Sequence, residues 1–206
     1  MILMQRLGIF GGTFNPPHKG HIYIVKEALI GAKLDKVIFM PCLQPPHKSV
    51  AGDVSAEHRY EMTKLAIQNE PRFEISDLEI KSGGPSYTAK TLEILKKEYP
   101  TSRLCFVLGG DSLRDLEKWY HPERIFSLAE IVALRRGGIE DRTFEESAEA
   151  YRSKYDAEIT VVDISPVKVS SSEIRKLLSE GRDVRHIMDE AVLEYIQKQG
   201  IYKDKD

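Results

Sequence analysis

The stretch LGIFGGTFNPPHKGH, residues 7–21, decides both the fold and the site of this chain. Its first four residues form a continuous apolar run, as expected of a strand buried on both faces of a parallel sheet. Gly11 and Gly12 then allow a tight turn and a close approach of the backbone to a ligand. Pro16 and Pro17 delay the next helix, because proline lacks an N–H and restricts the residue before it. The stretch therefore predicts a strand, a tight loop and the start of a helix.

Two histidines, His18 and His21, stand at the expected start of that helix. Residues three apart share a helix face, and a helix N-terminus attracts anions through its unpaired N–H groups and its dipole. The alternative is an ordinary proline-rich turn with two surface histidines. The preceding strand and the Gly-Gly turn favour phosphate binding instead. The stretch has the spacing of neither a P-loop nor the G-x-G-x-x-G dinucleotide fingerprint.

Apolar runs and amphipathic stretches alternate along the whole chain. This pattern predicts an α/β fold, a Rossmann-like doubly wound parallel sheet with helices on both faces. The expected strands are 7–10, 37–40, 73–75, 104–108, 131–134 and 159–164, and the expected helices are 20–31, 56–69, 88–99, 112–118, 145–155, 171–179 and 189–199. No linker is long enough to divide the chain, so we expect one domain over 1–206 with a small helical subregion from about 170 to 206.

Polar and glycine-rich segments follow several of the predicted strands. They are residues 11–21, 41–48, Asp111 and 168–175. In an open parallel sheet, ligands bind beyond the carboxyl ends of the strands, where strand order reverses. We therefore expect these segments to form a single composite site.

A second anchor, residues 168–175, follows the last predicted strand. Ser170 and Glu173 fit a capping box, which is common and sufficient by itself. Three successive serines, a new helix N-terminus and the planar guanidinium of Arg175 could also hold a pyrophosphate, together with Lys168.

Four further residues are candidates for the site, and two of them have a second interpretation. Thr88 stands at a turn and helix start. Asp111 could accept hydrogen bonds from ribose hydroxyls or serve as a helix N-cap. Trp119 could stack on a ligand ring or be partly buried in the core. Arg135, after the strand 131–134, is a candidate phosphate ligand.

The net charge of −2 gives no general attraction to nucleic acid or an anionic membrane, so phosphate chemistry must depend on locally placed cations. Cys42 and Cys105 have no metal-binding spacing, and we expect two buried free thiols. The N-terminal residues do not resemble a signal peptide, and no apolar segment approaches the length of a membrane span. We expect a cytoplasmic protein.

Four segments together resemble the bacterial nicotinate-nucleotide adenylyltransferases, within the H-x-G-H nucleotidyltransferase superfamily. They are GGTFNPPHKGH at 11–21, GPSYTAKTL at 84–92, LGGDSL at 108–113 with Trp119, and VSSSEIR at 169–175. The resemblance covers nearly the whole chain. It implies transfer of AMP from ATP to nicotinate mononucleotide by direct in-line attack, giving deamido-NAD and pyrophosphate in NAD biosynthesis.

The resemblance also implies a role for each matching residue. The catalytic set is His18, His21, Lys48 and Arg175. The ATP-binding set is Gly11, Gly12, Thr13, Phe14, His18, His21, Ser170, Ser171, Ser172 and Arg175. The substrate-binding set is Asn15, Lys48, Thr88, Asp111, Trp119, Tyr120 and Arg135. Mg²⁺ is expected on the ATP phosphates, with no metal ligand from the protein. ATP and nicotinate mononucleotide are the expected partners, with no nucleic acid or membrane, and a homo-oligomer is left open.

Arg59 with Met62 matches the family's R-x-x-M helix; the alternative is a solvated helix arginine. The chain also departs from the family pattern. Asn15 stands where aspartate is usual, Ser82 where arginine is frequent, and Arg136 where proline is more usual. Two other functions are kept: pantetheine-phosphate adenylyltransferase or another H-x-G-H nucleotidyltransferase, and a non-catalytic nucleotide-binding sensor.

Overall fold

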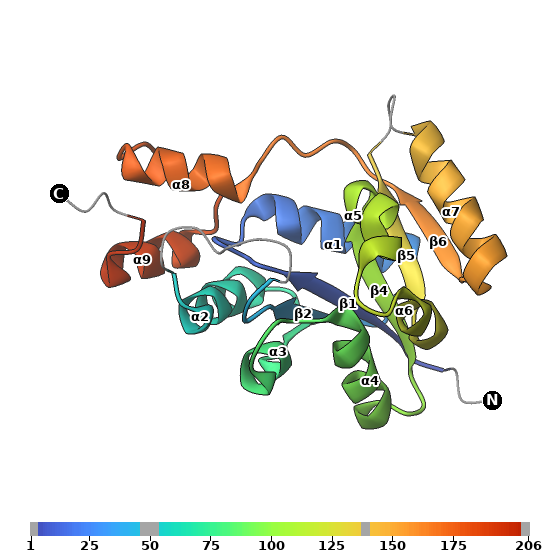
Figure 1. The fold of residues 1–206 in the computed structure, drawn as a ribbon. Coiled ribbons are helices and arrows are strands. Elements are labelled where there is room, and N and C mark those ends of the chain that lie inside the picture. The colour runs from blue at the N-terminus through green and yellow to red at the C-terminus, as the bar shows by residue number, and fades with distance from the viewer. Residues whose placement is uncertain (1–3, 46–53, 137–140, 203–206) are drawn as a thin grey trace.

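The computed structural model describes residues 4–45, 54–136 and 141–202. All six strands found there lie parallel in one sheet, in the order β3-β2-β1-β4-β5-β6 (Figure 1). They are β1 (Arg6–Gly12), β2 (Lys36–Pro41), β3 (Phe73–Ile75), β4 (Arg103–Gly109), β5 (Glu130–Arg135) and β6 (Ile159–Asp163). Strand order reverses between β1 and β4, and such a reversal opens a crevice for ligands at the carboxyl ends of the strands. The predicted Rossmann-like fold is confirmed.

The helices are close to those predicted from periodicity, with two additions. They are α1 (Lys19–Gly31), α2 (Ala56–Ile67), α3 (Leu78–Ser82), α4 (Thr88–Glu98), α5 (Gly110–Asp115), the 3₁₀ turn η2 (Leu116–Lys118), α6 (Pro122–Leu128), α7 (Asp141–Tyr155), α8 (Ser171–Ser179) and α9 (Glu190–Gln199). Periodicity predicts neither α3, which is a single short turn, nor α6. Pro122 at the first position of α6 is a start signal that could have revealed it.

Side chains alternate between the two faces of the sheet, and each face is covered by helices. One core layer packs apolar side chains of α4, α5, α6 and α7 against the sheet, including Leu92, Leu113 and Phe144. The opposite layer contains Val25 and Leu29 of α1. Burial on both faces explains why the strands are continuous apolar runs rather than alternating ones.

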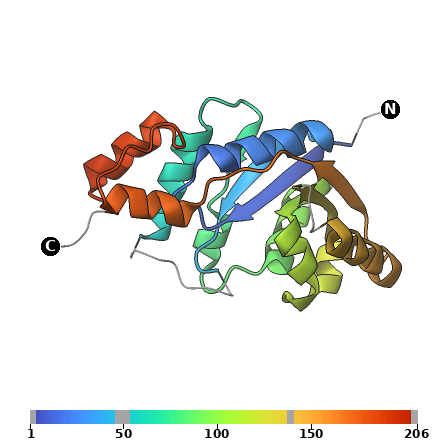
Figure 2. The same ribbon diagram turned by 90° about the horizontal axis from the view of Figure 1, so that it is seen from above.

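A third apolar cluster lies beside the sheet at the C-terminal end of the chain, where α8 and α9 pack next to α2 (Figures 1 and 2). It joins Met62 of α2 to Ile174 of α8 and Val192 of α9. Because α2 also contributes Ile67 to the core of the sheet, we propose that the helical subregion and the sheet form one domain. No helix in the described ranges is both long and apolar enough to cross a membrane.

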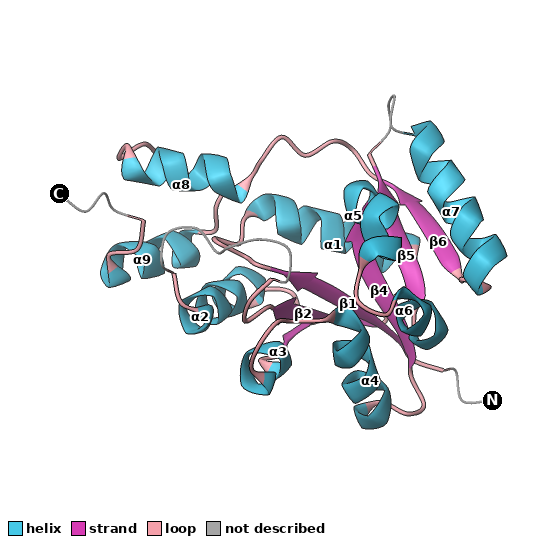
Figure 3. Ribbon diagram, viewed as in Figure 1, coloured by secondary structure: helices cyan, strands magenta, loops and turns pink. Residues whose placement is uncertain are grey.

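The loop from β6 to α8 passes alongside α1 (Figure 3), and so brings the end of the chain back to its beginning. Contact with the start of α1 is close: a Cβ at Gly20 would lie 2.8 Å from a methyl carbon of Val167. A side chain at position 20 would therefore force Val167 to shift.

Glu130 anchors the opposite, amino-terminal end of the sheet. Its carboxylate accepts hydrogen bonds from Arg6 at 2.8 and 3.0 Å and from the Thr160 hydroxyl at 2.7 Å, and it pairs with Arg103 at 2.7 Å. Burial of this carboxylate opposes its ionisation, but the hydrogen bonds from Arg6 and Thr160 prevail and hold the pKa of Glu130 below its ordinary value. The pairing joins β1, β4, β5 and β6.

We predict that Glu130→Gln lowers the free energy of unfolding by roughly 2–3 kcal/mol, because Arg6 loses its ion-pair partner and Arg103 keeps only the exposed Glu158. A carboxylate with a depressed folded pKa stabilises fully above its unfolded pKa, and this stabilisation is lost as pH falls through the folded pKa. The free energies of unfolding of wild type and variant, measured with urea, should therefore approach each other below about pH 4.5. Glu146→Gln, an exposed control on α7, should change stability by less than about 0.5 kcal/mol. If the free energy of unfolding of Glu130→Gln differed from that of wild type by the same amount at every pH, the ion pairs of Glu130 would be contradicted.

Candidate active site

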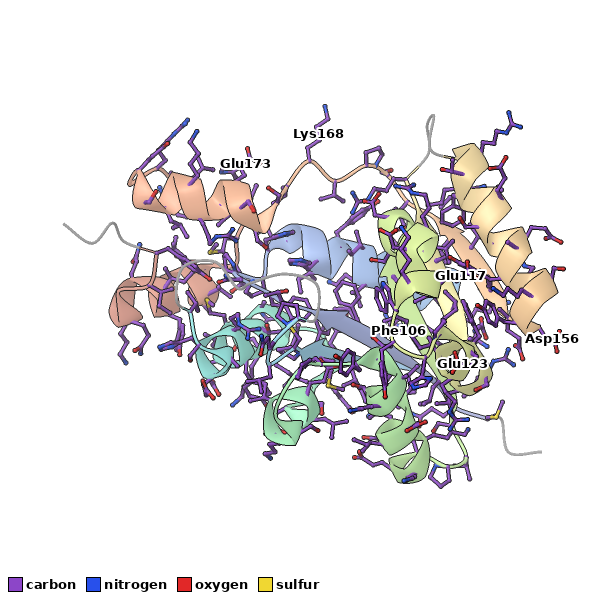
Figure 4. All side chains as sticks on the ribbon, viewed as in Figure 1. Phe106, Glu117, Glu123, Asp156, Lys168 and Glu173 are labelled. Carbon is purple, nitrogen blue, oxygen red and sulfur yellow. The ribbon has the colours of Figure 1, made fainter. Side chains whose placement is uncertain are left out.

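A cavity of about 530 Å³ joins the two ends of the sequence beyond β1. Among its lining residues are Gly12, Thr13, Phe14, Asn15, His18, Gly20, His21, Val167, Ser170, Ser171, Ser172 and Arg175. The predicted ATP-binding residues therefore line one hollow, except that Gly11 lies in the wall of a second, neighbouring cavity. Lys168 does not line the first cavity, and its side chain points away from the body of the molecule (Figure 4).

The two histidines form a reciprocal cap at the start of α1. The His21 N–H donates to Nδ1 of His18 at 3.3 Å, and the His18 N–H donates to Nδ1 of His21 at 3.2 Å. An Nδ1 atom that accepts a hydrogen bond carries no proton, so each neutral imidazole has its proton on Nε2. The rings stack with their centroids 3.7 Å apart. The cap thus fixes two parallel rings as N–H donors.

His18 is buried, and its burial lowers the pKa of the imidazole to about 4. The ring is therefore neutral near pH 7, so that it acts as a hydrogen-bond donor and not as a cation. Gly20 makes room for it, since a Cβ at that position would lie 2.9 Å from Nδ1 of His18.

The loop between β1 and α1 is fastened by the C-terminal part of the chain. Arg175 donates to the Asn15 carbonyl at 2.7 Å, and the Ser171 hydroxyl donates to the Pro16 carbonyl at 2.9 Å. The Tyr202 hydroxyl donates to the side-chain oxygen of Asn15. Ser170 caps α8 as predicted, since its hydroxyl oxygen accepts from the Glu173 N–H at 3.2 Å. Both anchors of the predicted site are therefore held in one unit.

The second cavity, of about 340 Å³, has aromatic walls. It is lined by Gly11, Gly12, Thr13, Cys42, Pro45, Glu79, Ser86, Tyr87, Thr88, Phe106, Trp119 and Tyr120. Trp119 packs edge-on against Phe106, with ring centroids 6.1 Å apart. The interpretation of Trp119 as partly buried in the core is confirmed, and because the ring also lines the cavity, its stacking on a ligand stays a prediction.

The start of α4 lies in the wall of this second cavity. Its N-cap residue, Tyr87, makes no side-chain capping hydrogen bond, in contrast to the N-caps of α1, α2, α8 and α9. An uncapped helix start leaves backbone N–H groups available to an anion. Thr88, the first residue of α4, lines the cavity.

Two charged residues outside the predicted site sets lie at the cavities, Glu79 in a wall and Arg59 behind one. Glu79 faces the second cavity and accepts a hydrogen bond from the Thr91 hydroxyl at 2.7 Å; burial raises the pKa of its carboxyl. Arg59 is only 1% exposed, so the alternative of a solvated helix arginine is wrong. The match of Arg59 to the family's R-x-x-M helix was the sequence signal that could have indicated its burial.

Two predicted substrate-binding residues of the described ranges, Asp111 and Arg135, line neither cavity. Asp111 forms an ion pair with Arg114 on α5. Arg135 pairs with Glu145 and, at 2.6 Å, with Asp163, and the arginine that lines the first cavity is the next residue, Arg136. Lys48 lies outside the described residues. Asn15, predicted for the substrate, lines the first cavity rather than the second.

Comparison with known proteins agrees with this geometry. Residues 9–177 match the cytidylyltransferase-like family, which places the chain in that class of nucleotide-binding proteins. A "Probable nicotinate-nucleotide adenylyltransferase" of Lachnoclostridium phytofermentans is 38% identical, covering 97% of this chain and 100% of the relative. One of the same name from Geotalea daltonii is 40% identical, covering 97% and 99%. The chain belongs to the nicotinate-nucleotide adenylyltransferase family, which confirms the resemblance.

The fold is also shared with a solved structure of nicotinic acid mononucleotide adenylyltransferase from Plasmodium falciparum, complexed with NaAD. The TM-score is 0.75 at 21% sequence identity, and the match covers 96% of this chain and 97% of that one. At this identity the similarity concerns the fold alone.

We predict that His18 stays neutral from about pH 8 to about pH 5. Burial opposes the charged imidazolium, so its NMR signals should keep the pattern of the Nε2–H tautomer and change only near pH 4. The spectrum of His18→Asn identifies the signals. A protonation step near the ordinary histidine value of 6.5 would contradict the buried, donating ring.

Proposed function

We propose that the chain transfers the AMP part of ATP to the phosphate of nicotinate mononucleotide, giving deamido-NAD and pyrophosphate. The observation that carries this proposal is that both cavities share Gly12 and Thr13. A nucleotide phosphate in the first cavity and an acceptor phosphate in the second would meet at these two residues. Bond formation between two phosphates requires such a meeting point.

The donors of the first cavity suit a triphosphate. His18 and His21 present imidazole N–H groups, α8 presents its N-terminus with Ser171 and Ser172, and Arg175 carries a positive charge. Hydrogen bonds to charged oxygens are shorter and stronger than those between neutral groups. We propose these residues, with Arg136, for the phosphates of ATP. Lys48 stays a prediction of the family motif.

The second cavity suits a pyridine ring with an anionic substituent. Trp119, Phe106, Tyr87 and Tyr120 supply aromatic surface, against which a flat ring can stack. The uncapped start of α4 supplies N–H groups for a carboxylate. We therefore propose the carboxylate form, nicotinate mononucleotide, as the preferred acceptor.

The reaction calls for positioning and charge stabilisation rather than proton removal. The acceptor phosphate is already anionic near neutral pH and can attack the α-phosphorus in line with the departing pyrophosphate. A bond forms between the acceptor phosphate oxygen and the α-phosphorus of ATP. At the same time the bond between the α-phosphorus and the oxygen that bridges to the β-phosphorus breaks, and this oxygen leaves with pyrophosphate. Neutral imidazole donors, oriented in advance by their mutual cap, can stabilise the charge that develops on the phosphoryl oxygens.

Mg²⁺ would enter with ATP in this proposal. The first cavity is lined by N–H, hydroxyl and guanidinium groups, which suit phosphate oxygens rather than a bare cation. Within the described part of the chain, no group of three or more His, Cys, Asp or Glu side chains could hold a metal ion. Mg²⁺ bound through phosphate oxygens and water fits these residues and would neutralise part of the triphosphate charge.

A pyrophosphate-release assay with ATP tests the acceptor. We expect turnover with nicotinate mononucleotide at a kcat/KM at least about tenfold above that with nicotinamide mononucleotide, since a carboxylate gains more than an amide from helix N–H groups. Pantetheine phosphate should give no product. Equal rates with the two pyridine nucleotides would contradict the role of α4, and no turnover with either would favour the nucleotide-binding sensor.

We also predict that His18→Asn lowers kcat by on the order of 100-fold or more while the protein stays folded. Asparagine is a good N-cap residue and can replace Nδ1 as an acceptor for the His21 N–H, but it does not carry an imidazole N–H into the cavity. His18→Ala loses both functions and should also lower the free energy of unfolding by about 1 kcal/mol. Near-normal kcat in a folded His18→Asn variant would refute the catalytic assignment.

A further inference from the structure

Arg59 is an unusual residue, because its charge is buried and no carboxylate of the described residues pairs with it. Its guanidinium donates to three backbone carbonyls: Cys42 at 2.7 Å, Thr13 at 2.9 Å and Leu43 at 2.9 Å. Its Nε has no hydrogen-bond partner. No ion pair of Arg59 is found in the described ranges. Glu57 on the same helix lies within electrostatic range, but it is exposed and therefore screened by water.

A buried charge of this kind is costly unless an opposite charge compensates it. Carbonyl dipoles offset part of that cost, but they are not a counter-ion. Ordinary helix arginines reach water, whereas this one is held at a fixed place inside the protein. The compensating charge is therefore to be sought on a bound ligand.

The position of Arg59 relative to the cavities supports this. Thr13, which accepts one of its hydrogen bonds, lines both cavities, and Cys42, which accepts another, lines the second. The guanidinium thus lies directly behind the wall where the two cavities meet. Phosphates of both proposed substrates would come close to it without touching it.

The carbonyls also set the direction of the neighbouring N–H groups. In a trans peptide the carbonyl and the following N–H point to opposite sides. The Cys42 carbonyl points to Arg59, and the next N–H, that of Leu43, accordingly points away and donates to the Ser86 hydroxyl at 3.1 Å. The Thr13 carbonyl likewise turns the Phe14 N–H away from Arg59. The positive ends of these peptide dipoles therefore face away from the cation and extend its field outward.

We propose that Arg59 is a positioning residue whose buried charge is balanced by the substrate phosphates. It holds the loops after β1 and β2 together and gives the site a positive potential that anionic ligands feel across one layer of backbone. The proposal rests on the proposed function, which supplies the anionic ligands. It differs from a merely structural role in one respect: removal of the charge must weaken binding in proportion to ligand charge.

The test compares the affinities of the full-length protein for ATP and for adenosine, measured by calorimetry and by competition. Arg59→Met removes the charge, and Arg59→Lys keeps it with fewer hydrogen bonds. The ATP-to-adenosine affinity ratio should fall at least on the order of tenfold in Arg59→Met, as expected for charges roughly 10 Å apart in protein surroundings. It should stay within about threefold of wild type in Arg59→Lys. Lys64→Met, which removes an exposed charge from the same helix, should leave the ratio unchanged.

The proposal would be overturned if Arg59→Met lost affinity for ATP and for adenosine by the same factor. It would also be overturned if the ATP-to-adenosine affinity ratio were as low in Arg59→Lys as in Arg59→Met. If Arg59→Met does not fold, Arg59→Lys is measured from about pH 7 to about pH 10, where a lysine can lose its charge and an arginine cannot. The ATP-to-adenosine affinity ratio of Arg59→Lys should then fall with rising pH relative to that of wild type. The same pH dependence in both proteins would overturn the proposal. Because binding is measured without turnover, pyrophosphate release by wild type tests the proposed function separately.

Discussion

The structure depends on one junction, in which the C-terminal part of the chain fastens the loop between β1 and α1. Arg175 and Ser171 of α8 bind the carbonyls of Asn15 and Pro16, while the Lys19 N–H donates to the Ile187 carbonyl at 3.0 Å. A loop after a parallel strand has few backbone partners of its own. These hydrogen bonds supply partners from more than 150 positions away in sequence and place the N-termini of α1 and α8 around one cavity.

Hydrogen-bond donors predominate among the polar groups proposed to hold the phosphates. His18 is kept neutral by burial and presents an N–H, the helix starts present backbone N–H groups, and Arg59 supplies a fixed charge from behind the wall. Such donors need no proton transfer and little rearrangement during a reaction between anions. Around the two cavities, α1 and α8 are capped by side chains that line the first cavity, whereas α4 has no side-chain cap at the second.

Sequence patterns predicted those parts of the site that lie in short segments with local signals. Two glycines and two prolines after a strand marked the loop, and Ser170 with Glu173 marked the start of α8. Side-chain partners formed across the fold could not be read in this way. From the sequence, Asp111 and Arg135 were expected to bind the ligand. In the structure, Asp111 forms an ion pair with Arg114 of α5. Arg135 forms ion pairs with Glu145 of α7 and Asp163 of β6. Arg136, one residue further along, lines the cavity instead.

The sequence by itself determined the parallel sheet, its strands, most of its helices and the two motifs of the site, because apolar periodicity and helix-start signals act over a few neighbouring residues. Only the tertiary structure decided which charges are buried, which are paired and which proton each imidazole keeps. Arg59 illustrates the difference. Its position on a helix was predicted from the sequence, but its burial against three backbone carbonyls depends on the loops after β1 and β2, which are brought to it by the tertiary fold. Electrostatic state depends on the whole surroundings of a group, and those surroundings come from segments distant in sequence.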